Sequence, residues 1–310
     1  MATHEIEFLS FNGRDTIQGW VYTPVKKPKG IIQLVHGFGE HSRRYFYMIS
    51  KFVEAGYIVA ANDHIGHGKT AQVNDSWGDF GDKGYLTAVE DEYKLFNIIT
   101  EKYPSLPVGI YGHSWGSLIV RKFVSLYGDK VKAAVFCGTT IIFGQVEDIL
   151  KKSGKLVKAG KGNERDETLV GMLFSEMKSR YPEEESPSAW ISVTPEVIVE
   201  NESDPFNNLG MLPTIQSIHD FCELITDVNQ VEWSESVPKE LPIYNIAGDQ
   251  DPVGNYGEGV YHVSNMLWST GHTDIQTRIY PGFRHEIHNE PEIKDEVIDR
   301  MIEFYNNKLK

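Results

Sequence analysis

The sequence is poor in cysteine and lacks long apolar runs. Its 310 residues include two cysteines, Cys137 and Cys222, too few for a disulfide framework, and neither is placed like one of a pair of metal ligands. No apolar stretch approaches the roughly 18 to 20 residues that cross a bilayer. The first ten residues have neither the basic end nor the apolar core of a signal peptide. We therefore expect a cytoplasmic protein in a reducing compartment.

Basic residues are also scarce relative to acidic ones. The chain has 30 Lys and Arg residues against 44 Asp and Glu residues, a formal net charge of −14. A phosphate backbone needs a concentrated basic surface, so this balance argues against nucleic acid as a partner. It also weakens any electrostatic docking on anionic membranes. The 40% hydrophobic fraction is that of an ordinary globular protein, and the length suits one large domain with an insertion or two domains.

Strand-like and helix-like patterns alternate along the first part of the chain. Two amphipathic runs joined at Asn12-Gly13 predict an antiparallel hairpin. Nearly continuous apolar runs then follow, typical of strands buried on both faces: GIIQLVHG, YIVAAND, PVGIYGHS and KAAVFCG. Helical patterns separate them at residues 42–55, 87–103 and 115–127. This alternation predicts an α/β fold with a doubly wound, mostly parallel sheet.

The alternation stops near Thr139 and resumes at about residue 238. The later part contains the strands LPIYNIAG and IQTRIYPG, a helix between them, and a closing helix from Glu290 to about Asn307. The residues in between form short, irregular apolar segments without strand patterns. We therefore predict an α/β core of residues 1–138 and 238–310 that carries a helical cap insertion at residues 139–237.

The pentapeptide GHSWG places Ser114 between Gly112 and Gly116. Alone, it fits an ordinary Gly/Ser turn as well as a nucleophile elbow. Its context favours the elbow, because a strand leads into it and a helix leads out. Ser114 is then the candidate nucleophile, and such a serine needs a base oriented by a third group.

The acid and the base should follow strands after the elbow, since functional groups collect at the carboxyl ends of strands in doubly wound sheets. Asp249 and Asp251 follow one such strand, and His285 follows the next. The order Ser114, Asp251, His285 is that expected of a catalytic triad on this fold. We prefer Asp251 to Asp249 because it lies further out on the turn and Pro252 fixes the backbone after it.

The developing oxyanion requires two preorganised N–H donors. Trp115, directly after the nucleophile at a helix start, is one candidate. Phe38, in the glycine-rich loop HGFG after an early strand, is the other.

Two further segments resemble known binding motifs but do not have the required spacing. RHEIHNE separates His285 and His288 by three positions rather than four, which argues against a zinc site. GHGKT has Asp63 where a phosphate-binding loop needs its first glycine.

Together, HGFGEHSRRY, DHIGHGKT, GHSWG, GDQDPV and YPGFRHEIHNE resemble the monoglyceride lipase and lysophospholipase branch of the α/β-hydrolases. The insertion segment WISVTPEVIVENESDP is similar to the cap of bacterial members. The resemblance runs in order over nearly the whole chain. It implies a serine hydrolase without metal or other cofactor, with Asp251 as the triad acid, Phe38 and Trp115 as the oxyanion donors, and a cap that forms a lipophilic tunnel.

We accordingly expect hydrolysis of single-chain acyl esters such as monoacylglycerols. A lysophospholipase and a general short- or medium-chain carboxylesterase are the enzymatic alternatives, and a ligand receptor on a hydrolase fold is the non-enzymatic one. A small acyl ester is the expected partner, with at most weak, transient contact between the cap and a membrane or micelle. Apolar cap residues should wall an acyl pocket above Ser114: Met172, Leu173, Phe174, Met177, Phe206 and Met211. Because Phe38 and Trp115 are bulky, we expect a preferred chain of about eight to twelve carbons.

Overall fold

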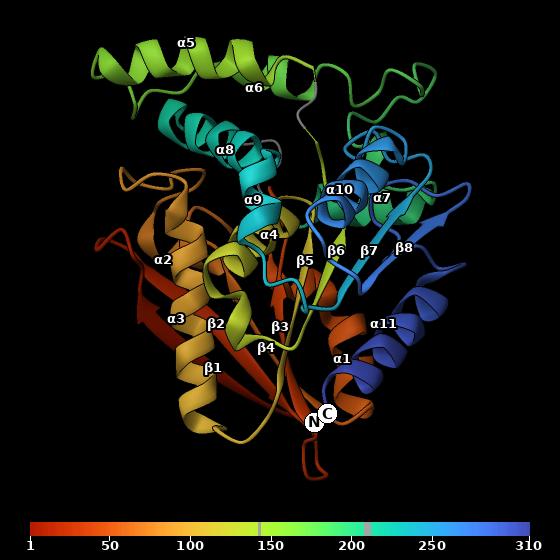
Figure 1. The fold of residues 1–310 in the computed structure, drawn as a ribbon. Coiled ribbons are helices and arrows are strands. Elements are labelled where there is room, and N and C mark those ends of the chain that lie inside the picture. Colours follow the sequence, from red (N-terminus) through yellow and green to blue (C-terminus); the bar gives the residue numbers. More distant parts are fainter. Residues whose placement is uncertain (142–143, 208–211) are drawn as a thin grey trace.

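The computed structural model describes residues 1–141, 144–207 and 212–310 (Figure 1). Eight strands form one sheet in the order β1-β2-β4-β3-β5-β6-β7-β8. Their bounds are β1 Ala2–Leu9, β2 Thr16–Thr23, β3 Gly30–Val35, β4 Tyr57–Asp63, β5 Val108–His113, β6 Ala133–Cys137, β7 Ile243–Gly248 and β8 Ile275–Tyr280.

The first two strands pair antiparallel, and β2 also runs antiparallel to β4. Every pair from β4 through β3, β5, β6 and β7 to β8 is parallel. Gly13 in the first connection has φ of +73°, a left-handed conformation that suits the hairpin turn. The predicted doubly wound, mostly parallel sheet is therefore confirmed.

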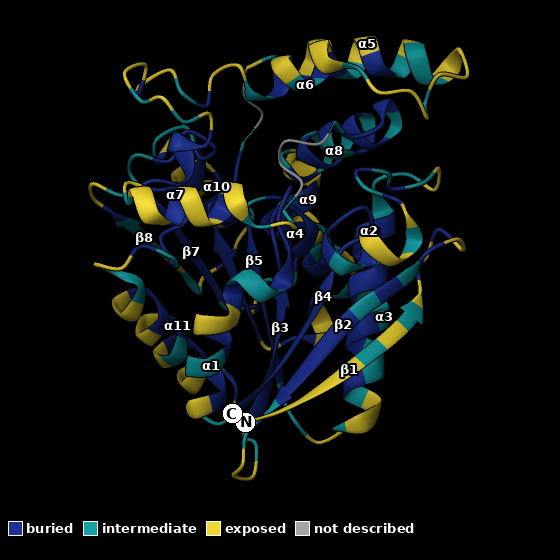
Figure 2. Cartoon of the chain, turned by 180° about the vertical axis from the view of Figure 1, so that it is seen from behind, coloured by how far each residue is buried: buried dark blue, intermediate teal, exposed yellow. Residues whose placement is uncertain are grey.

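Helices cover both faces of the sheet, and a separate apolar core lies on each side. Side chains of α1 and α11 pack on one face, and side chains of α3, α4 and α10 pack on the other. Figure 2 shows the central strands buried and the outer helix faces exposed. The helix bounds are α1 Phe46–Glu54, α3 Leu86–Lys102, α4 Trp115–Tyr127, α10 Glu258–Ser269 and α11 Lys294–Lys308. No helix among the described residues is both long and apolar enough to cross a membrane.

The segment between β6 and β7 is helical, and none of its described residues belongs to a strand of the sheet. Its helices lie over one end of the sheet, with α5 packed on α8 at the outer edge (Figure 1). Their bounds are α5 Val146–Lys158, α6 Glu167–Phe174, the short 3₁₀ helix η3 Ala189–Ile191, α7 Pro195–Ser203, α8 Ile215–Val228 and α9 Val231–Ser236.

The GHGKT segment leads into a short helix, α2 (Gly68–Asn74), and Asp63 Oδ2, at the end of β4, accepts a hydrogen bond from the Lys69 amide at 2.7 Å. One element differs from the sequence-based expectation. The closing helix begins at Lys294 rather than at Glu290. The Glu290 carboxylate instead accepts hydrogen bonds from three residues of the insertion: Ser192, Val193 and Thr194.

Candidate active site

Ser114 lies on a sharp turn between β5 and α4. Its φ and ψ angles are 55° and −123°, a strained conformation for a residue with a side chain. The Ser114 amide donates to the carbonyl of Cys137, at the end of the neighbouring strand β6, at 2.9 Å. The Ser117 hydroxyl donates to the Ser114 carbonyl at 2.5 Å. The surrounding backbone thus holds the turn that aims the serine away from the sheet, as a nucleophile elbow requires.

The glycines on either side of Ser114 are required by close backbone contacts. A Cβ atom on Gly112 would lie 2.3 Å from the carbonyl oxygen of Gly116. A Cβ atom on Gly116 would lie 2.3 Å from the carbonyl oxygen of Val35 and 2.4 Å from that of His36. All three distances are far below van der Waals contact. The glycine spacing in the sequence therefore reflects the packing of α4 against the ends of β3 and β5.

His285 and Asp251 form a buried pair. The Nδ1 atom of His285 lies 2.9 Å from Asp251 Oδ2, and the other carboxylate oxygen accepts from the Val253 amide at 2.9 Å. Burial alone would lower the pKa of His285, but the charge of Asp251 and its hydrogen bond outweigh burial and raise that pKa. Among the described residues, Nε2 of His285 has no hydrogen-bond partner. This nitrogen is therefore available to take a proton.

Asp249, the alternative acid, has a different environment. Its Oδ1 accepts hydrogen bonds from the Gly282 amide at 2.7 Å and from the Gln250 side chain at 3.2 Å. These contacts join the turn after β7 to the turn after β8. The structure therefore pairs Asp251, not Asp249, with His285.

Ser114 and His285 converge at the end of β6. The Ser114 amide is bonded to Cys137, and a Cβ atom on the next residue, Gly138, would lie 2.9 Å from His285 Cε1. The Trp190 ring lies 5.1 Å from the His285 ring, centroid to centroid, and lines the same pocket as Ser114. The three residues proposed as a triad from sequence are thus gathered at the carboxyl ends of β5, β7 and β8.

The amides of Phe38 and Trp115 donate no hydrogen bond to another described residue. The peptide before Phe38 is oriented by His36. The His64 amide donates to His36 Nε2 at 2.9 Å, so Nδ1 carries the proton and donates to the Gly37 carbonyl at 2.8 Å. Because carbonyl and N–H point opposite ways in a trans peptide, this bond fixes the direction of the Phe38 N–H.

Glu40 braces the same loop. Its Oε1 accepts from the Gly37 amide at 2.7 Å and from the Tyr45 hydroxyl at 2.6 Å. Burial would raise the pKa of Glu40, but the hydrogen bond from His113 and the charge of Arg44 hold it well below its usual range. The sequence motif HGFGEHSRRY contains this residue, but composition and periodicity do not reveal its role.

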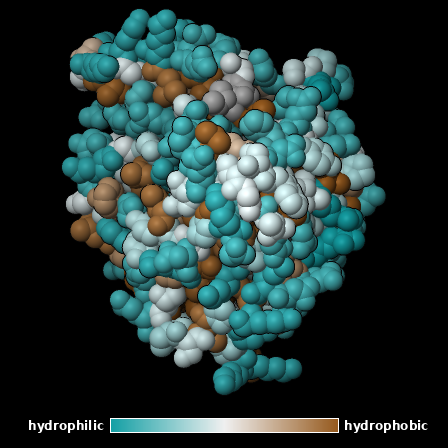
Figure 3. All heavy atoms as spheres, viewed as in Figure 1, coloured by the Kyte–Doolittle hydropathy of each residue, from teal (hydrophilic) through white to brown (hydrophobic). Residues whose placement is uncertain are grey.

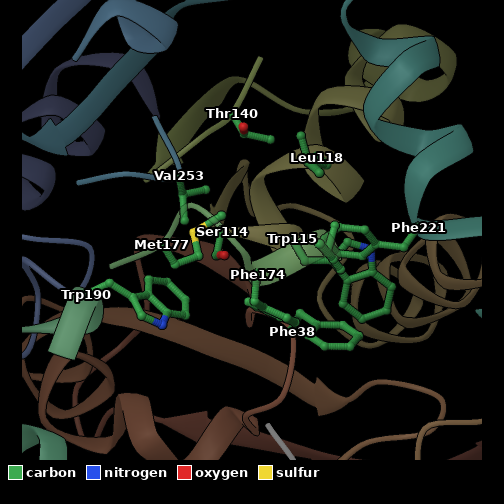
Figure 4. A pocket seen from close by; sticks show the side chains of 11 residues that line it. Phe38, Ser114, Trp115, Leu118, Thr140, Phe174, Met177, Trp190, Phe221 and Val253 are labelled. Atoms are coloured by element: carbon green, nitrogen blue, oxygen red, sulfur yellow. The ribbon is translucent and has the colours of Figure 1, made fainter. Parts of the chain in front are cut away.

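Ser114 opens onto an apolar pocket (Figure 4). Figure 4 shows Ser114 between Met177 and Trp190 on one side and Trp115 and Phe38 on the other. The remaining lining residues are Leu118, Thr140, Leu173, Phe174, Phe221 and Val253. The pocket is narrow, about 40 Å³ in volume. That is room for only a few water molecules at about 10 to 15 Å³ each.

A second, wider cavity of about 580 Å³ adjoins the first, and Phe174, Met177 and Trp190 line both. Its other lining residues are Pro187 and six polar ones: Ser175, Lys178, Ser188, Asn201, Glu202 and Asn207. The two cavities together have an apolar inner part next to Ser114 and a mixed outer part.

Some sequence-based expectations for the pocket need correction. Leu173, Phe174 and Met177 line it as expected. Met172 instead receives a contact from the Lys152 ammonium at 3.3 Å, and Phe206 packs 5.7 Å from the His41 ring. Met211 lies outside the described residues. Sequence reasoning missed five lining residues, because no pattern in the sequence shows which side chains face the pocket: Leu118, Thr140, Trp190, Phe221 and Val253.

One buried group has metal-ligating side chains. Ligand atoms of His113, Cys137 and His288 lie within 4.8 Å of one another. However, His113 Nδ1 contacts the Tyr45 hydroxyl at 2.8 Å, and burial raises the pKa of the Cys137 thiol. In the metal-free protein this thiol is therefore protonated, and one nitrogen of His113 is already in contact with Tyr45.

The parallel sheet, the serine elbow after β5 and the Asp–His pair after β7 and β8 define an α/β-hydrolase. The family described as serine aminopeptidase, S33, matches residues 26–292. The chain belongs to this hydrolase family.

Several known proteins are similar over most or all of this chain. A thermostable carboxyl esterase from Bacillus coagulans, solved in complex with glycerol, is 48% identical with both chains fully covered and a TM-score of 0.98. A lipase solved in an open form is 34% identical with full coverage of both chains and a TM-score of 0.94. A monoacylglycerol lipase from Mycolicibacterium smegmatis is 28% identical over 88% of this chain and 87% of its own length.

Proposed function

We propose that the protein is a serine carboxylester hydrolase that cleaves esters carrying a single acyl chain, such as monoacylglycerols. Ser114 attacks the ester carbonyl while His285 Nε2 takes its proton and later passes it to the leaving alcohol. Asp251 orients His285 and stabilises its charged form. The amides of Phe38 and Trp115 bind the oxyanion. Water then releases the acid in a second, equivalent step.

The observation that carries this proposal is the buried Asp251–His285 pair beside a strained serine in an apolar pocket, with no described residue bonded to His285 Nε2. The raised pKa of His285 suits a general base that becomes an imidazolium in the transition state. The similarity to an esterase and to a monoacylglycerol lipase agrees with an ester as substrate.

The two cavities suggest how a substrate is placed. The narrow apolar space next to Ser114 suits the carbons adjoining the ester. A chain of medium length must displace Phe174 or Met177, or pass them into the wider cavity of about 580 Å³. These residues lie in residues 139–237, which we propose act as a cap that selects the substrate while the sheet carries the chemistry.

A lysophospholipase would need cations near the bound phosphate. Lys151, Lys152, Lys155 and Lys158 are exposed along α5, and none of them lines either cavity. Figure 3 shows hydrophilic side chains along this outer edge, with apolar ones directly beneath it. The lysine row therefore fits a solvated helix face. Lys178 does line the wider cavity, where its ammonium donates to the Glu184 carbonyl, so the substrate panel has to separate a neutral acyl ester from a lysophospholipid.

A fluorophosphonate probe tests the proposal directly. It should label the wild-type protein at Ser114 and fail to label Ser114→Ala, whereas a receptor that had lost catalysis would not be labelled. A panel of monoacylglycerols, lysophospholipids and p-nitrophenyl esters then identifies the substrate class. Absence of label in a folded wild-type protein, or equal labelling of Ser114→Ala, would refute the proposed mechanism.

A further inference from the structure

Arg121 is a fully buried arginine on α4, two helical turns after Ser114. Among the described residues it has no ion-pair partner. Burial lowers its pKa to about 9, so it still carries its charge at neutral pH. Burying an unpaired charge is costly unless hydrogen bonds compensate for it. Its partners therefore indicate what this position does.

The guanidinium reaches both ends of the helical insertion. One nitrogen, Nη1, donates to the Thr140 carbonyl at 2.8 Å and to the Thr139 hydroxyl at 3.3 Å. The other, Nη2, donates to the Val228 carbonyl and to the Asn229 side chain at 3.0 Å. Thr139 and Thr140 begin the insertion, and we call them the first root. Val228 and Asn229, at the negative end of the α8 dipole, belong to the second root.

Trp233 completes the second root. Its ring centroid lies 4.4 Å from the Arg121 guanidinium carbon, a cation–π contact in a dry environment. Its indole N–H donates to the backbone carbonyl of Arg121 at 2.6 Å. Both the side chain and the backbone of Arg121 are therefore joined to the second root.

These contacts lead directly to the substrate pocket. Thr140, whose carbonyl Arg121 holds, lines the pocket together with Leu118 of the same helix. Figure 4 shows these two side chains on the same side of the pocket. Phe221, another lining residue, lies on α8, whose last carbonyl also accepts from Arg121. One planar group thus joins the nucleophile helix to two walls of the pocket.

We infer that Arg121 is a positioning residue that clamps both roots of the insertion to the nucleophile helix and thereby sets the acyl-chain preference. The inference rests on the proposed ester hydrolysis. A planar fork with five donors can bond to both roots at once, whereas a lysine ammonium is a point charge on a flexible stem. Arg121 touches neither the ester nor the reacting atoms, so its loss should change selectivity more than chemistry.

The test compares Arg121→Met and Arg121→Lys with Lys122→Met. Lys122 is a matched control, because it also joins α4 to the end of α8 through an ion pair of 2.8 Å with Asp227, but this pair is partly exposed whereas Arg121 is fully buried. For each folded variant, kcat and KM are measured with p-nitrophenyl esters of two, four, eight and twelve carbons. Hydrogen exchange is measured at both roots.

In both Arg121 variants we expect kcat/KM for the two-carbon ester to stay within about twofold of wild type. For the eight-carbon ester, kcat/KM should fall about tenfold, mainly through a higher KM. A tenfold loss is the lower end of the discrimination that one extra or missing methylene produces in an apolar pocket. Exchange at both roots should accelerate. Lys122→Met should leave the chain-length profile unchanged. If Arg121→Met does not fold, Arg121→Lys decides.

An unchanged profile in Arg121→Lys would overturn the inference, and so would an equal loss at every chain length or the same change in Lys122→Met. The proposed function can fail separately. If wild-type protein neither hydrolyses esters nor takes the fluorophosphonate label, the mechanism is wrong. Hydrogen exchange still tests the clamp in that case, because unchanged exchange at the roots in both Arg121 variants would refute it.

Discussion

Replacing Asp251 by Asn removes one charge and leaves the shape of the site almost intact. In wild type, His285 Nδ1 lies 2.9 Å from the Asp251 carboxylate, and both side chains are buried. The asparagine NH₂ group can donate a hydrogen bond to His285 Nδ1 where the aspartate accepted one. The imidazole then carries its proton on Nε2, which is the wrong tautomer for a general base. In serine proteases the same change costs about 10⁴ in kcat, which corresponds to about 5.5 kcal/mol of transition-state stabilisation. We expect a loss of this order here.

The pH dependence of Asp251→Asn provides an independent signature. Asp251 raises the pKa of His285 against the lowering effect of burial, so removing the carboxylate leaves burial to lower that pKa. A general base works in its neutral form, and the acid limb of kcat/KM follows its pKa. The acid limb should therefore move to lower pH in the variant. The ratio of wild-type to variant kcat/KM should therefore be greater at pH 8 than at pH 5.

Asp249→Asn is the matched control. Asp249 accepts a hydrogen bond from the Gly282 amide at 2.7 Å, and an asparagine oxygen can still accept it. We expect kcat/KM within about twofold of wild type, because the Asp249 carboxylate bonds to Gln250 and Gly282 and not to His285. The assay is hydrolysis of a p-nitrophenyl ester from pH 5 to 9, with folding checked by circular dichroism. A larger loss in Asp249→Asn than in Asp251→Asn, or equal large losses, would refute the assignment of the acid.

Four further predictions concern the serine, a metal chelator, the elbow and the insertion. Ser114→Ala should lower kcat by roughly 10⁴- to 10⁶-fold in a folded protein, because the triad acts as a unit. Retention of a tenth of the wild-type activity would contradict the role of Ser114. EDTA should leave the wild-type rate unchanged. Gly116→Ala should lower the free energy of unfolding in urea by about 3 kcal/mol or more, since the new Cβ would lie 2.3 and 2.4 Å from the carbonyl oxygens of Val35 and His36. Gly171→Ala is the control, because the space around its Cβ is open. It should leave stability unchanged or raise it by up to about 1 kcal/mol. Replacing residues 139–237 by a Gly/Ser linker should flatten the rise of kcat/KM with ester length from two to eighteen carbons, whereas an unchanged profile in a folded variant, or an intact enzyme that prefers acetate, would contradict the cap.

The sheet was predictable because burial on both faces leaves a strong local pattern. Runs such as YIVAAND, now β4, are almost continuously apolar, and a parallel central strand requires this. The candidate triad followed from topology, because the carboxyl ends of β5, β7 and β8 meet at one edge. The sequence favoured Asp251 over Asp249 through its place on the turn, Pro252 and the family resemblance, but periodicity does not separate two residues on one turn. The contact between Asp251 and His285 is visible only in the folded structure.

The insertion was predictable only as a helical region. Its packing against the sheet depends on single contacts between distant segments, and these have no period in the sequence. Glu290 illustrates this limit: it reads as the start of the closing helix, yet its carboxylate binds the backbone and hydroxyls near Ser192. A buried acid whose partners lie about a hundred residues away cannot be told from a surface acid by pattern alone.

The burial of Arg121 also could not be predicted from a local sequence pattern, and in this case it bears on function. A charged residue in an amphipathic helix is expected on the solvent side, but every hydrogen-bond partner of the Arg121 guanidinium that the structure describes is a carbonyl or side-chain oxygen of the insertion. Such a charge is stable only while both roots are in place. In the proposed mechanism the nucleophile helix therefore serves two purposes. The turn before it presents Ser114, its first residue presents the Trp115 amide, and Arg121 in its middle holds the segment that walls the pocket. If this coupling holds, changes to the insertion that keep the bonds to Arg121 should alter chain-length preference without lowering activity toward short esters. Changes that break those bonds should loosen the pocket even when no lining residue is altered.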